Sequence, residues 1–136
     1  MSGAYGSTSG TDERESRPVM EPLMHFVLGE EVERLRAEEA WRDGDRNSRT
    51  LAKDVDFRAL LTVLRPGATL DEQHGDARAS IQLLEGGATL RVVDESIELV
   101  RGQLAVIDAG RPWTLEASSD AAVLLTLAWP LTKSRI

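Results

Sequence analysis

The segment Gly102–Ala117, GQLAVIDAGRPWTLEA, decides the fold that is predicted for this chain. Its two short apolar runs, Leu104–Ile107 and Trp113–Ala117, have the length of β-strands. The turn signal Gly110-Arg111-Pro112 separates them, as expected between the strands of a small β-sheet fold. The segment therefore predicts two strands of an all-β array.

The same pattern extends over most of the chain. After Thr50 the apolar residues alternate or form short runs, and turn signals such as Pro66-Gly67 and Gly86-Gly87 separate these runs. The expected strands are Phe57–Leu64, Ala79–Leu84, Thr89–Val93, Ser96–Val100, Leu104–Ile107, Trp113–Ala117 and Ala121–Trp129. Because no crossover helices lie between them, the pattern predicts a sandwich or small barrel and excludes a parallel α/β sheet.

The N-terminal third has a different character and divides into two parts. Residues 1–18 are rich in Gly, Ser and Thr and are predicted to be a disordered tail. Residues 19–44 are predicted to form an apolar arm and one surface helix, Leu28–Arg42, which ends at a left-handed Gly44. Residues 45–136 remain as the β-barrel domain.

Composition excludes several classes of function. The chain has 136 residues, which suits one domain, and its net charge of −7 argues against a nucleic-acid partner. No apolar run is long enough to span a membrane, and the N-terminus does not resemble a secretory signal, so we expect a cytoplasmic protein. The chain has no cysteine, so disulfides and thiolate metal ligands are absent.

Two motifs make the chain resemble the cupin superfamily, over about residues 45–130. The second cupin motif is Gly, five residues, Pro, any residue, Gly, two residues, His, three residues and Asn. Its spacing is kept here without a gap, although Pro, His and Asn are replaced. The residues at the five motif positions are Gly102, Asp108, Gly110, Trp113 and Ala117.

The first cupin motif begins at Pro66-Gly67 and ends at the turn Leu84-Glu85-Gly86. Counting back from Gly86 places the family's glutamate ligand at Ala79. The paired histidines of the family fall either on Gln73 and Gly75 or, with one more spacer residue, on Glu72 and His74. At most one of the three family histidines is therefore present.

The resemblance implies an all-β double-stranded β-helix, or jelly-roll barrel, with a metal or small ligand in its lumen. It also implies a homodimer. Alternate residues of a strand share a face, so the family's ligand positions determine which side chains point inward. The predicted ligand-binding lumen consists of His74, Ala79, Ile81, Leu83, Trp113, Leu115 and Ala117, whereas Gln82, Thr114 and Glu116 point outward.

This lining is mostly apolar, and an Fe, Mn, Ni or Zn site needs several converging nitrogen and oxygen donors. Glu72, His74 and Asp76 are the candidate ligands if a metal is bound, but we favour no cofactor and no catalytic residues. Trp113 has two interpretations: a core residue that fills the volume of a lost metal, or the wall of a ligand pocket.

The sequence thus predicts a cupin-domain protein with a degraded metal site, which binds a small, partly apolar molecule or serves as a structural module. Two alternatives remain open. One is a metal-dependent dioxygenase or isomerase that uses Glu72 and His74. The other is a protein that docks on a partner through its N-terminal arm.

Overall fold

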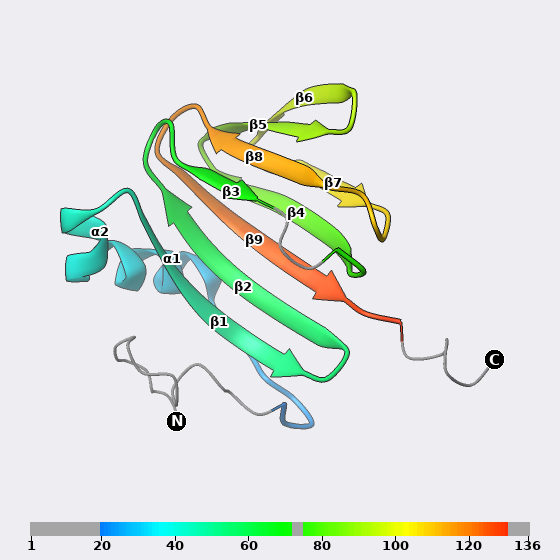
Figure 1. Cartoon of the computed structure of the whole chain (residues 1–136). Coiled ribbons are helices and arrows are strands. Elements are labelled where there is room, and N and C mark those ends of the chain that lie inside the picture. The colour runs from blue at the N-terminus through cyan, green and yellow to red at the C-terminus, as the bar shows by residue number, and fades with distance from the viewer. Residues whose placement is uncertain (1–19, 72–74, 131–136) are drawn as a thin grey trace.

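The computed structural model describes residues 20–71 and 75–130 of the chain. In this part of the chain the strands form two antiparallel sheets, which face each other as the layers of a barrel (Figure 1). The strand order is β1-β2-β9-β4-β7 in the five-stranded sheet and β3-β8-β5-β6 in the four-stranded sheet. The predicted all-β, double-sheet architecture is therefore confirmed.

The bounds of the elements follow in chain order. Two short helices, α1 (Leu28–Arg36) and α2 (Glu39–Asp43), precede the strands. The strands are β1 (Arg46–Asp54), β2 (Phe57–Leu64), β3 (Thr69–Asp71), β4 (Arg78–Glu85), β5 (Gly87–Val92), β6 (Glu95–Val100), β7 (Leu104–Ile107), β8 (Trp113–Ala117) and β9 (Ala121–Ala128). The strands expected at β2, β7 and β8 have the predicted bounds. Those at β6 and β9 differ by one residue at one end, and those at β4 and β5 differ by one or two residues at both ends.

The five-stranded sheet packs hydrophobic side chains on both of its faces. On the face toward the other sheet, side chains such as Leu64, Ile81 and Val123 join the main core. On the opposite face Leu61 and Val63 of β2 pack against the helices (Figure 1). Alternation along β2 thus sends neighbouring residues into two different hydrophobic clusters, which explains why the strand is an almost continuous apolar run.

The helical region differs from the single helix predicted over Leu28–Arg42. The helix breaks at Glu38, whose backbone is extended (φ −88°, ψ 157°). The Glu38 carboxylate accepts hydrogen bonds from Asn47 Nδ2 at 2.9 Å and from Arg49 at 3.1 Å, both on β1. These contacts with distant residues redirect the chain, so α2 begins as a separate helix and buries Trp41.

Gly44 also differs from the prediction, because it has extended geometry (φ −135°, ψ −166°) and no left-handed conformation. The chain passes through it directly from α2 into β1. Of the arm, residues 20–27 are described; Phe26 packs beside the helices, whereas Leu23 is 82% exposed. The predicted tail, residues 1–18, lies outside the described residues. None of the described helices is long and apolar enough to cross a lipid bilayer.

Candidate functional site

An open cavity of about 340 Å³ lies between the two sheets, and we call it the barrel pocket. Strands from both sheets contribute to it, together with Ala77 in the segment before β4. Its apolar lining consists of Leu60, Leu70, Ala77, Trp113, Leu125 and Leu127, and its polar lining of Arg46, Ser48, Thr62, Thr69 and Asp71. A small apolar pocket with a few polar groups is the usual form of a small-molecule site.

The polar groups of the barrel pocket have fixed positions. Ser48 Oγ and Thr62 Oγ1 are 2.9 Å apart and share a hydrogen bond across β1 and β2. Arg46 donates through Nε and Nη2 to the two carboxylate oxygens of Asp45, at 3.1 and 3.3 Å, and through Nη1 to the backbone oxygen of Thr69. The hydrogen bond from Arg46 is the main reason why the pKa of Asp45 is lowered from its ordinary value. Arg46 is therefore already occupied by protein groups.

The six predicted lining residues on strands β4 and β8 all point inward. They are Ala79, Ile81, Leu83, Trp113, Leu115 and Ala117, and each is at most 5% exposed. All belong to the core between the sheets, and only Trp113 among them also lines the barrel pocket. The assignment of these residues to ligand binding stays a prediction. Their inward direction matches the alternation expected from the two motifs.

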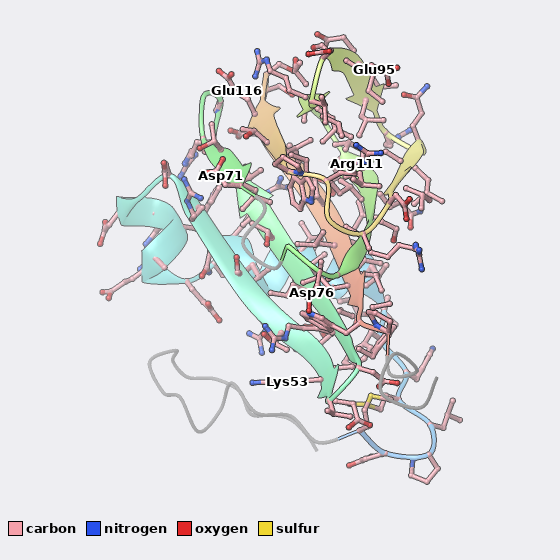
Figure 2. All side chains as sticks on the ribbon, turned by 45° about the vertical axis from the view of Figure 1, so that its right-hand side comes forward. Lys53, Asp71, Asp76, Glu95, Arg111 and Glu116 are labelled. Atoms are coloured by element: carbon pink, nitrogen blue, oxygen red, sulfur yellow. The ribbon has the colours of Figure 1, made fainter. Side chains whose placement is uncertain are left out.

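The residues available for a metal fit poorly at the described positions. The motif resemblance places the family's glutamate at Ala79 and a histidine at Trp113, and both side chains are buried. Neither side chain donates an oxygen or an imidazole nitrogen. Asp76 is exposed in the loop before β4 (Figure 2). Glu72 and His74 lie outside the described residues. Within residues 20–71 and 75–130 no three His, Cys, Asp or Glu side chains come together as a metal site.

Several pocket residues were not predicted from the sequence. Ser48 and Arg46 belong to β1, whose apolar pattern is too weak to reveal a strand. Leu125 and Leu127 lie in a predicted strand, but their contribution depends on β9 being placed between β2 and β4. The alternation of polar residues at Arg46, Ser48 and Thr50 was the available signal, because it marks a strand with one polar face.

A cation and an aromatic ring lie beside the barrel pocket. Arg58 of β2 pairs with Leu127 in the β2–β9 register and is two residues from Leu60, so it shares the face of both lining residues. The Cζ atom of Arg58 is 5.4 Å from the centroid of the Trp129 ring. Trp129 in turn packs against the main core. This pair extends the site toward the end of the β1–β2 hairpin.

A second cavity, of about 510 Å³, lies between the β5–β6 hairpin and β7. It includes Val93 and Val106, which are 63% and 65% exposed. Both β6 and β7 are edge strands of their sheets. Exposed apolar side chains along edge strands are typical of a protein–protein surface, so this region is less suited to a small ligand.

The arrangement of two facing antiparallel sheets around an open pocket defines a double-sheet β-barrel. Among solved structures, similar ones include a conserved protein of unknown function from Streptococcus pyogenes, with 27% identity and a TM-score of 0.59. The alignment covers 62% of this chain and 75% of that one. A cupin superfamily protein from Desulfitobacterium hafniense has 17% identity and a TM-score of 0.59, with 62% and 78% of the two chains covered.

An ectoine synthase from P. lautus has 21% identity and a TM-score of 0.56, and the alignment covers 67% of this chain and 69% of that one. No family model matches the chain, and no curated protein matches it either. The structural matches establish the fold: the chain is a small domain with the cupin jelly-roll fold. The resemblance drawn from the spacing of its two motifs is thereby confirmed.

Proposed function

We propose that this cupin-fold domain binds a small, partly apolar molecule in the barrel pocket and does so without a metal ion. The observation that carries the proposal is the lining of the pocket. Trp113, Leu125 and Leu127 supply apolar surface, and the bonded hydroxyls of Ser48 and Thr62 supply polar contacts. Apolar walls with a few oriented polar groups suit a ligand that is itself mostly apolar.

The absence of suitable donors at two family ligand positions supports the metal-free part of the proposal. Ala79 and Trp113 occupy these positions and have no donor atoms for a transition metal. Burial of the Trp113 ring also fills space between the sheets. Without side chains that bind a metal at these two positions, the affinity of the pocket for a ligand depends on shape and hydrogen bonding.

The test combines ligand binding with two variants. A panel of small amphiphilic compounds is screened for an increase in the thermal unfolding temperature, since a ligand that binds only the folded state stabilises it. Trp113→Ala should abolish the increase. Leu35→Ala is the matched control, because Leu35 is fully buried on the helix side of the sheet and the change destabilises the fold without altering the pocket. Equal responses in the two variants would contradict the proposal.

The enzyme alternative makes a separate prediction. It needs Glu72 and His74 as metal ligands, with Asp76 as a third candidate. Metal analysis of protein that was expressed in medium supplemented with iron and manganese distinguishes the two functions. Near-stoichiometric metal that is lost in His74→Ala would favour the enzyme, and metal-free protein that still binds the compounds would favour the binding domain.

A further inference from the structure

Arg58 is a half-buried cation whose Nε donor is unsatisfied among the described residues. Its Nε atom is inaccessible to solvent and has no hydrogen-bond partner among residues 20–71 and 75–130. A buried donor without an acceptor is costly, and such groups in native structures call for an explanation. The Trp129 ring packs against the guanidinium and limits its freedom to turn elsewhere. The side chain is therefore held on the same face as Leu60 and Leu127, which line the barrel pocket, with an Nε donor that the described residues leave unused.

Three arginines in the described residues have a buried Nε without a hydrogen-bond partner: Arg36, Arg49 and Arg58. Two of them bind carboxylates through other atoms. Arg36 Nη1 lies 2.6 Å from Glu85, and Arg49 Nη2 lies 3.1 Å from Glu38. For Arg58 no carboxylate of the described residues plays this role. Arg58 thus differs from the other two arginines in lacking a carboxylate partner among the described residues, and it lies on the same face as two lining residues of the barrel pocket.

A similar arginine–tryptophan pair on the helix side of the sheet shows what a structural pair looks like. The Cζ atom of Arg65 lies 3.8 Å from the centroid of the Trp41 ring. Arg65 Nη2 also donates to the backbone oxygen of Trp41 at 2.9 Å. This guanidinium is held by protein groups on both its ring face and its edge. The guanidinium of Arg58 likewise has an aromatic ring against its face, but none of the described residues accepts a hydrogen bond from its edge.

We propose that the ligand of the barrel pocket carries a carboxylate and that Arg58 binds it. The inference rests on the proposed function, because it names the chemical class of the same ligand. A guanidinium presents paired donors that match the two oxygens of a carboxylate. The rest of the molecule lies against Leu60, Leu125 and Leu127, which line the pocket next to Arg58.

The charges around the pocket favour a ligand with a single negative charge. Lys53 lies opposite Arg58 in the β1–β2 register, but its side chain extends outward from the edge of β1 (Figure 2), so Arg58 is the cation considered at this end. Asp71 lines the other end of the pocket and carries a negative charge (Figure 2). With a net charge of −7 on the whole chain, a dianion such as a phosphate monoester meets more repulsion than a monoanion. The volume of about 340 Å³ restricts the ligand to a small molecule.

The test uses matched acids and amides as probes. Benzoate, 4-phenylbutyrate and octanoate, each with its primary amide, are titrated into ¹⁵N-labelled protein, and the indole N–H signals of the three tryptophans are followed. The acids should shift the signals of Trp113 and Trp129, which lie at the pocket and beside it. The signal of Trp41 should stay in place, because this ring lies in the cluster on the opposite face of the sheet.

The variant Arg58→Gln should weaken binding of the acids by about tenfold or more and leave binding of the amides unchanged. Arg91→Gln is the control, since it removes the same charge from an exposed arginine that pairs with Glu116 outside the pocket. Equal weakening in both variants, or equal binding of acids and amides, would overturn the role of Arg58 only. If neither acids nor amides move the Trp113 and Trp129 signals, the proposed function itself fails.

Discussion

The turn Leu84-Glu85-Gly86 allows a prediction whose size follows from the structure. Gly86 has a left-handed backbone (φ 76°), and a Cβ atom there would overlap the carbonyl oxygen of Asp120 and lie 3.0 Å from the Cα atom of Ala121. Gly102 has a similar backbone (φ 88°), but a Cβ atom would meet nothing within 4 Å. Replacing each glycine by alanine therefore separates backbone strain from steric overlap.

Gly102→Ala should lower the free energy of unfolding by about 1 kcal/mol, which is the cost of the left-handed conformation. Gly86→Ala should lower it by about 3 kcal/mol, because the overlap with backbone atoms forces the β4–β5 turn away from the start of β9 and adds about 2 kcal/mol. Urea denaturation followed by circular dichroism measures both losses. The unfolded-state effect of Gly→Ala is common to the pair and cancels. Equal losses would refute the argument that close packing against Asp120 requires glycine in this turn.

Three further predictions concern single side chains. Trp113→Ala should lower the free energy of unfolding by about 3 kcal/mol in urea denaturation, since it removes a large ring that is 5% exposed. The hydrogen bond from Arg78 holds the pKa of Asp108 below its ordinary value of 3.8, so the stabilisation is present above that pH and is lost as the pH falls below it. In Arg78→Gln the pKa of Asp108 should rise toward 3.8 in an NMR titration. The expected homodimer is tested with a variant of edge strand β7. If β7 forms the interface, Val106→Lys should be a monomer in analytical sedimentation. Val55→Lys, in an exposed turn, is the control and should leave the dimer intact.

The parts of the fold that could be predicted are those governed by local pattern. In β8 the residues Trp113, Leu115 and Ala117 are buried and the two between them are half-buried, so the period of two is visible in the sequence. The spacing of the two motifs also predicted that this strand belongs to a cupin-like barrel. Strand β1 was missed because its pocket-facing residues, such as Arg46 and Ser48, are polar.

The remaining features depend on contacts between residues that are distant in the chain. The break between α1 and α2 occurs where Glu38 is drawn toward Asn47 and Arg49, and helix periodicity contains no sign of these bonds. The lining residues of the barrel pocket likewise come from both sheets, and no single segment of the sequence predicts the order of the strands. For the same reason the sequence does not predict that Arg58 lies opposite the lining residue Leu127, because this placement depends on the pairing of β2 with β9.

Under the proposed function, the buried ring of Trp113 affects what ligand binding in the barrel pocket depends on. A metal site requires deprotonated ligands and available metal, so its occupancy varies with pH and with chelators. Burial of the Trp113 ring stabilises the same region by about 3 kcal/mol, and this stabilisation needs neither condition. Under the proposed function, binding of a carboxylate should therefore be unchanged by EDTA. It should also be unchanged between pH 6 and 8, because a guanidinium stays protonated and a carboxylate stays ionised over this range.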